Sequence, residues 1–300
     1  MNAVLFYSTL GIYFVATVAY LAYLIKPRET LGQASRWLIT AGFLLHCAFT
    51  LDRYLEAGRT PITNLHESLS FFSLSIVGVF IIIERKYKVF ILGSFVTPVA
   101  LILMLVSTIF PTAITPLNPA LKSKWLAVHT TVAFFGYATF AVAFGAAIMY
   151  LIQEHFLKSK KLGAMYQKLP SLDKLDDINY RCLTFGFPLL TLAIISGAIW
   201  AETAWGTYWS WDPKETWSLI TWFVYAALLH GRLTTGWRGK KAAILAIIGF
   251  FVLLFTFIGV NLLLPGLHSA QSLDFLARTK KSSFPIWKPI VSHPDFPDGN

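Results

Sequence analysis

The chain has 300 residues, of which 56% are hydrophobic and only 13% are charged. This composition excludes a soluble globular protein and predicts an all-α, polytopic integral membrane protein. The formal net charge is +10. Most of this charge lies in short connections between apolar runs, so we do not interpret it as nucleic-acid binding.

Apolar runs that can cross a membrane as helices occur eight times along the chain. The second, third and seventh are shorter than the roughly 20 apolar residues that a span needs, so we expect their helices to include polar flanks. The first run lacks a basic n-region and a small-residue cleavage site, which predicts a retained helix and not a signal peptide. The runs are Ala3–Ile25, Trp37–Leu51, Ser68–Ile83, Val89–Phe110, Trp125–Ile152, Leu183–Trp200, Trp217–His230 and Ala242–Leu264.

Basic residues are unevenly divided between alternate connections. One set of connections holds sixteen of the 25 Lys and Arg residues, and the other set holds nine. The positive-inside rule places the larger set in the cytoplasm, so both termini are predicted to lie on the outer side. We expect residues 1–265 to form one transmembrane helical domain, and residues 266–300 to form an outer turn that bears a His, followed by a flexible tail.

Polar residues interrupt the apolar pattern at a few places along the chain. His46 lies near the middle of the second run, where it either binds a metal or forms hydrogen bonds with a neighbouring helix. His66 follows a helix start at Thr63 or Asn64, and we expect it on the polar surface. Further on, residues 172–178 have an amphipathic pattern that predicts a short segment lying on the membrane surface.

The chain has two cysteines, Cys47 and Cys182. They are far apart and form no C-x-x-C motif, so the chain is not expected to perform thiol–disulfide exchange itself. It also lacks C-x-x-C-H, which excludes a c-type haem acceptor.

The segment from Trp200 to Trp222 contains six of the ten tryptophans. It lies between two apolar runs, so we expect an outer loop, residues 200–217, at the membrane surface. Each Trp alone is compatible with an ordinary interfacial anchor. Together the aromatic rings favour stacking against a large flat ligand. The candidate binding residues are Trp200, Trp205, Gly206, Tyr208, Trp209 and Trp211.

A helix start follows these aromatic residues. Asp212 fits the N-cap position, Pro213 the first helical position, and Glu215 the third, from which its carboxylate reaches back to the cap. A helix N-terminus beside Lys214 also attracts an anion, such as a propionate carboxylate. The capping and ligand-binding interpretations are compatible.

Two histidines, His129 and His268, are predicted at the outer surface on either side of the Trp-rich segment. Such a pair beside a flat aromatic surface suggests that two imidazoles ligate a haem iron. Lys122, Lys124 or Lys214 would then pair with the propionates.

His230 is different, because it lies at the predicted cytoplasmic end of its helix. It is a candidate ligand for a second haem within the membrane. Its partner would be His46 or a histidine of another subunit.

Several motifs of this chain resemble those of the tryptophan-rich haem-handling proteins, and specifically the CcsA/ResC branch of system II cytochrome c biogenesis. The resemblance implies that the Trp-rich loop binds haem b, with His129 and His268 as axial ligands. It also implies that His230 ligates a transmembrane haem, whose second ligand comes from a CcsB/ResB-type membrane protein. The motifs are Pro61–Ser68, Leu169–Leu172, Gly186–Thr191, Trp200–Ala201, Trp205–Gly206, Tyr208–Glu215, Leu229–His230 and Gly266–Ser269.

The activity that the resemblance implies is that of a cytochrome c haem lyase (holocytochrome c synthase) subunit, active only with its CcsB/ResB partner. Haem would move outward from His230 to the outer site. There the thiols of a C-x-x-C-H motif in apocytochrome c, kept reduced by thiol-reducing proteins of the outer compartment, would add across its vinyl groups. We expect the chain in a cytoplasmic membrane or a thylakoid membrane.

Other functions share some of these features. A haem exporter or a system I haem-delivery protein would have the same aromatic loop and outer His pair. A b-type electron carrier would usually place facing His pairs in its membrane helices, and is disfavoured because His46 and His230 lie at different depths. The sequence W-S-W-D-P-K-E at residues 209–215 favours system II.

Overall fold

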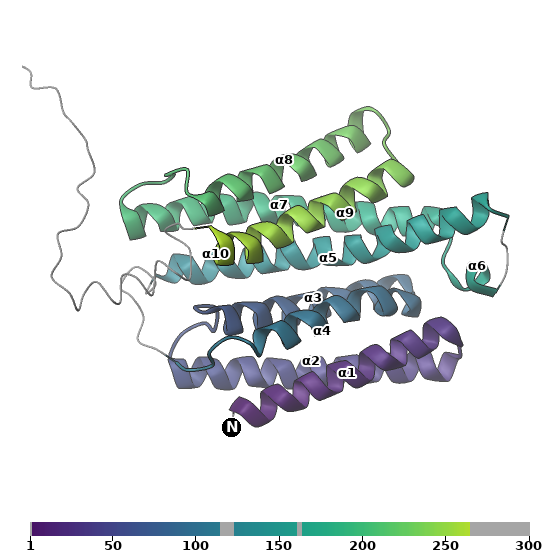
Figure 1. Ribbon diagram of the computed structural model, residues 1–300, viewed down its shortest axis with the longest axis horizontal. Helices are drawn as coiled ribbons and strands as arrows, with labels where there is room; N and C mark the ends of the chain where they lie inside the picture. Colours follow the sequence, from purple (N-terminus) through teal and green to yellow (C-terminus); the bar gives the residue numbers. More distant parts are fainter. Residues whose placement is uncertain (1, 115–122, 161–163, 265–300) are drawn as a thin grey trace, which may run out of the picture.

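The structure, a computed structural model, describes residues 2–114, 123–160 and 164–264 and is helical throughout, with no strand in these ranges (Figure 1). The all-α prediction is therefore confirmed. The elements are α1 (Asn2–Ile25), α2 (Glu29–Ala57), α3 (Leu65–Tyr87), the 3-10 turn η1 (Phe90–Leu92), α4 (Gly93–Ser107), α5 (Lys124–Lys158), α6 (Ala164–Lys168), α7 (Leu172–Trp205), α8 (Pro213–Thr234), α9 (Lys240–Leu254), the π-helical turn η3 (Phe255–Gly259) and α10 (Val260–Leu263).

Seven stretches of helix in the described residues are long and apolar enough to cross a membrane. The protein is thus a multi-pass membrane protein. The remaining predicted span, Trp217–His230, corresponds to α8, which has 22 residues and lies alongside α7 and α9 (Figure 1). It is not among the seven because polar residues occur along its length, among them Thr216, Ser218, Thr221, His230 and Arg232. The predicted polar flanks of the short runs are confirmed, since α2 has 29 residues and α3 has 23.

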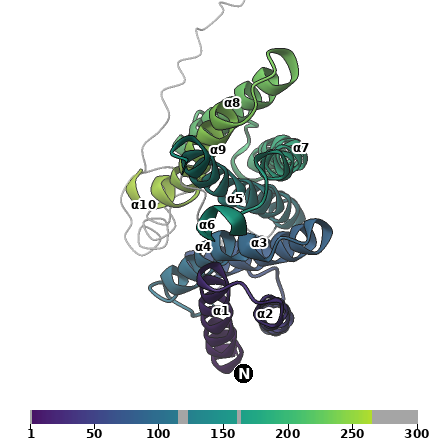
Figure 2. The same cartoon turned by 90° about the vertical axis from the view of Figure 1, so that its right-hand side faces the viewer.

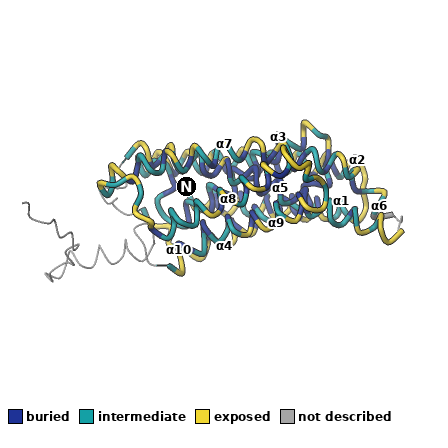
Figure 3. The backbone as a smooth tube through the Cα atoms, turned by 90° about the horizontal axis from the view of Figure 1, so that it is seen from above, coloured by how far each residue is buried: buried dark blue, intermediate teal, exposed yellow. Residues whose placement is uncertain are grey.

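The central helix of the bundle is α5, which packs against α3, α4, α7 and α9. Viewed end on, α1 to α4 lie on one side of it and α7 to α9 on the other (Figure 2). Close packing is possible because the stretch of small residues from Ala141 to Ala147 is buried in the interior. Buried segments line the inside of the bundle and exposed ones its outside and ends (Figure 3).

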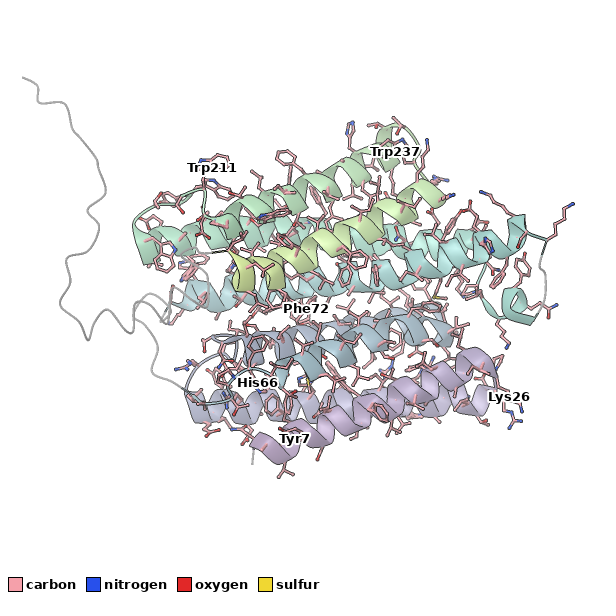
Figure 4. The ribbon with its side chains drawn as sticks, in the orientation of Figure 1. Tyr7, Lys26, His66, Phe72, Trp211 and Trp237 are labelled. Atoms are coloured by element: carbon pink, nitrogen blue, oxygen red, sulfur yellow. The ribbon has the colours of Figure 1, made fainter. Side chains whose placement is uncertain are left out.

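The two ends of the bundle differ in composition. We call the end that carries residues 206–212 the tryptophan end, and the opposite end, with Lys26 and Trp237, the basic end (Figure 4). Helix α1 begins toward the tryptophan end and α10 ends there (Figure 1). At the basic end, Arg232 makes two hydrogen bonds to the Asp176 carboxylate, which ties α8 to α7.

Two expectations about polar segments are wrong. Residues 172–178 do not lie on the membrane surface, because they form the first turns of α7, and Leu175 and Ile178 are fully buried in the core. The amphipathic pattern reflects packing against protein. His66 is not on the polar surface either. It is buried, its Nδ1 donates to the backbone carbonyl of Ser107 at 2.9 Å, and its ring lies against that of Phe6.

Candidate functional site

The connection between α7 and α8 is shorter than the predicted outer loop of residues 200–217. Helix α7 continues to Trp205, and α8 begins at Pro213, so only residues 206–212 are non-helical. Gly206 ends α7 with a left-handed φ of +79° and its N–H bonds to the carbonyl of Glu202, the usual helix-ending geometry of glycine. Trp200 therefore lies on α7 and Trp217 on α8, and each is held by a helix.

The predicted helix start is confirmed. The Asp212 carboxylate accepts the backbone N–H of Lys214 at 3.2 Å, and the Glu215 carboxylate accepts the backbone N–H of Asp212 at 3.2 Å. Glu215 also accepts the N–H of Ser210 at 2.7 Å. This capping box joins the short loop to the first turn of α8, so the backbone that carries the aromatic residues of the loop is held in place.

A cavity of about 220 Å³ opens at the tryptophan end. It lies between the start of α3, the helices α5 and α7, and α10. A single water needs only about 10–15 Å³ of such space, so the cavity accommodates a larger ligand. Its lining includes these predicted site residues: His129, Trp200, Trp205, Tyr208, Trp209, Lys214 and Glu215. Trp211 is not among them. It is 68% exposed and its ring meets that of Trp209 edge to face.

His129 is oriented by α7. Its Nδ1 lies 2.7 Å from the backbone carbonyl of Ala193. Because a carbonyl only accepts, Nδ1 carries the proton, and in the neutral ring Nε2 has a lone pair of the kind that metal ions bind. The ring is parallel to that of Trp200, with centroids 6.5 Å apart. It also packs so closely on Gly197 that a Cβ there would lie 2.8 Å from His129 Cε1. A backbone carbonyl bonded to the second ring nitrogen is typical of metal-binding histidines.

The candidate cations differ in position. Lys214 lines the cavity, and its Nζ donates to Asn261 Oδ1 at 3.1 Å. Lys124 is exposed at the start of α5. Lys122 lies outside the described residues, as does His268, so the predicted axial pair is represented in the structure by His129 alone.

The other candidate histidines lie apart from the cavity. His230 is exposed on α8 near the basic end. His46 is fully buried on α2, with Nδ1 3.1 Å from Tyr13 Oη and Nε2 2.9 Å from Ser70 Oγ. Ligation of iron by His46 would break one of these hydrogen bonds. Figure 2 shows α2 and α8 on opposite sides of the bundle, so His46 and His230 do not face each other.

Several residues of the cavity wall had no role in the sequence interpretation. Ala193 contributes through its backbone, and Gly197 through its lack of a side chain, so neither carries a sequence signal. Thr256 and Asn261 reach the wall from the π-helical turn and the helix after it. A polar residue such as Asn261 near the end of a membrane helix is the signal that would have indicated it. Among the described residues, no three His, Cys, Asp or Glu form a metal-binding group.

The sequence matches the family described as Cytochrome C assembly protein over residues 62–268, which is more than two thirds of the chain. The chain belongs to the cytochrome c assembly protein family. A similar relative in this family is the cytochrome c biogenesis protein CcsA of Guillardia theta, 42% identical over 72% of this chain and 78% of its own. CcsA of Synechocystis sp. is 38% identical over 84% of this chain and 92% of its own.

A solved structure, Cytochrome c Heme Lyase CcmF, has a similar fold, with a TM-score of 0.62 and 18% sequence identity. The similarity covers 86% of this chain and 46% of CcmF, so the chain spans about half the length of that protein. At this identity the comparison concerns the fold alone.

Proposed function

We propose that this member of the cytochrome c assembly family binds haem b in the cavity at the tryptophan end and presents it for attachment to apocytochrome c. The observation that carries the proposal is the setting of His129, an imidazole oriented by the Ala193 carbonyl on the wall of an aromatic cavity. Trp200, Trp205 and Trp209 supply ring faces and edges for a flat macrocycle. His268 is the proposed second axial ligand.

The reaction that this arrangement serves is the addition of two cysteine thiols of a C-x-x-C-H motif across the vinyl groups of haem. Each addition forms one C–S bond, and the thiol hydrogen goes to the neighbouring vinyl carbon. The chain contributes by holding the haem in place, since the sequence singles out no separate general acid or base. The histidine of the acceptor motif would then replace one of the two axial histidines. In this role the chain is a subunit of a cytochrome c haem lyase.

A second haem site is proposed at His230. This side chain is exposed on α8, so it is available to a ligand shared with another membrane protein. We propose that a CcsB/ResB-type partner supplies the second ligand, that haem passes from this site to His129, and that thiol-reducing proteins keep the acceptor cysteines reduced. The membrane would be a bacterial cytoplasmic membrane or a thylakoid.

The test is the visible spectrum and haem content of the full chain purified in detergent with its partner. We expect His129→Ala and His268→Ala to remove one haem signal that added imidazole restores, and His230→Ala to deplete a separate pool. His155→Ala is the matched control, because His155 is exposed near the basic end of α5 and lines no part of the cavity. Wild-type haem content in all three ligand variants would refute the assignment.

A further inference from the structure

Lys214 places a positive charge on the wall of the cavity, and no acidic side chain of the described ranges forms an ion pair with it. The neighbouring carboxylates accept backbone groups: Asp212 accepts the N–H of Lys214 itself, and Glu215 accepts N–H groups of the loop. The hydrogen bond to Asn261 uses one of the three N–H donors of the ammonium. Asp212 acts on the ammonium through space but forms no ion pair with it. A partly buried charge without a direct counter-ion favours an anionic ligand.

Asn261 holds this ammonium in place without neutralising it. Its side-chain Nδ2 donates to the backbone carbonyl of Phe257 at 2.5 Å, which leaves Oδ1 to accept from Lys214 Nζ. The π-helical turn Phe255–Gly259 comes directly before it. Such a turn holds one residue more than an α-helical turn and shifts the register of the residues after it. The turn thus sets the rotation that brings Asn261 to the cavity wall beside Thr256 and Phe257.

A second hydrogen-bond donor lines the same cavity. The indole N–H of Trp209 is buried and has no acceptor in the part of the chain that the structure describes. A buried donor without a partner costs free energy unless a ligand or water accepts from it. A carboxylate, with two oxygens and about four acceptor positions, satisfies such a donor and the ammonium of Lys214.

We propose that Lys214, oriented by Asn261 and joined by the Trp209 N–H, binds a carboxylate of the ligand and thereby orients it in the cavity. The inference rests on the proposed function, in which the carboxylate is a propionate of haem. The propionates lie on one edge of the ring and the vinyl groups on the opposite half, so a fixed propionate site turns the half that carries the vinyl groups away from Lys214. Lys214 is on this view a specificity-determining residue for the orientation of haem.

The experiment compares two probes, haem and its dimethyl ester, in absorbance titrations of the full chain in detergent. The ester keeps the iron and the ring but has no propionate charge. We expect wild type to bind haem about tenfold more tightly than the ester, as a charge-assisted hydrogen bond implies. Lys214→Met removes the charge, and Asn261→Asp places a carboxylate beside it at the loss of the hydrogen bond to the Phe257 carbonyl, so both should lose this preference. Lys158→Met, at an exposed lysine at the other end of α5 and outside the cavity lining, should keep it.

Binding of the ester serves as the folding control, since both variants are expected to bind it as wild type does. A Lys214→Met chain that still prefers haem tenfold would overturn the carboxylate site. So would a chain that loses haem and ester equally, because the lysine would then be structural. If wild type binds neither probe, the proposed haem-handling function itself fails.

Discussion

Gly197 provides the space in which the His129 ring lies. A Cβ at this position would be 2.8 Å from Cε1 and 2.9 Å from Nδ1, so in Gly197→Ala the ring must move away from the Ala193 carbonyl. Disturbing the outer partner of a metal-binding histidine typically lowers affinity 10- to 100-fold. We expect Gly197→Ala to bind haem at least about tenfold more weakly in a spectral titration, with partial recovery of the low-spin spectrum on adding imidazole.

Gly11→Ala is the control for this substitution. Gly11 lies within α1, and a Cβ there would have no neighbour within 4 Å. Both variants replace a helical glycine with alanine, which favours the helix by about 1 kcal/mol, so neither is expected to unfold. Equal haem affinity in the two variants would show that the position of the His129 ring does not matter for binding.

For single residues, the sequence predicted the hydrogen bonds between near neighbours in the chain. It did not predict hydrogen-bond partners that come from distant helices. The roles of Asp212 and Glu215 depend on residues within a few positions of them, and the predicted capping box is present. The partners of His129 and Lys214 come from helices 64 and 47 residues away. A backbone carbonyl and a helix register shifted by a π turn leave no local pattern, so the structure was needed to find them.

Helix α7 is joined to α8 and α9 by one carboxylate. Asp176 accepts two hydrogen bonds from Arg232, at 2.9 and 2.7 Å, and one from the backbone N–H of Gly239 at 3.1 Å. The Arg232 side chain is only 5% exposed. Removing one partner of a buried pair costs about 3 kcal/mol or more, because the other charge stays unpaired. We therefore expect Asp176→Asn to lower the thermal unfolding midpoint in detergent by several degrees.

The next residue along α7 gives a matched control. Asp177 pairs with Arg181 on the same helix, and the Arg181 and Asp177 side chains are 51% and 43% exposed. Asp177 Oδ2 also accepts the Tyr87 hydroxyl at 3.1 Å, and asparagine keeps an oxygen for this bond. Such a pair contributes about 0–1 kcal/mol, so Asp177→Asn should leave the midpoint nearly unchanged. Equal shifts in the two variants would mean that burial of the Arg232 pair does not set its contribution.

The ends of the helices could be predicted where hydropathy determines them. They could not be predicted where tertiary packing determines them. The seven spans follow from apolar length, whereas the first turns of α7 carry polar residues and are helical because Leu175 and Ile178 pack into the core. Likewise the predicted outer loop is longer than the observed one. Several tryptophans near a membrane surface are compatible with a loop or a helix, so their number does not show that α7 includes Trp205 and ends at Gly206.

The part of the chain that the structure describes has an even number of crossings only if α8 spans the membrane together with the seven other spans. Its 22 residues measure about 33 Å at 1.5 Å per residue, enough for a hydrocarbon core of about 30 Å. With α8 as a span, residues 235–239 lie on the same side as the end of α5, and the Lys and Arg distribution predicts that this side is cytoplasmic. We therefore predict that Arg238 and Lys158 face the cytoplasm and that Glu202 faces outward.

Single cysteines at these three exposed positions test the arrangement. In a background of Cys47→Ala and Cys182→Ala, a membrane-impermeant thiol reagent added to intact cells should label Glu202→Cys. It should label Lys158→Cys and Arg238→Cys only after the membrane is permeabilised. Labelling of Arg238→Cys from outside would mean that α8 returns to the outer surface, and the reverse pattern at all three sites would invert the protein. In the inverted case the cavity with His129 would face the cytoplasm, where it could not present haem to an acceptor on the outer side.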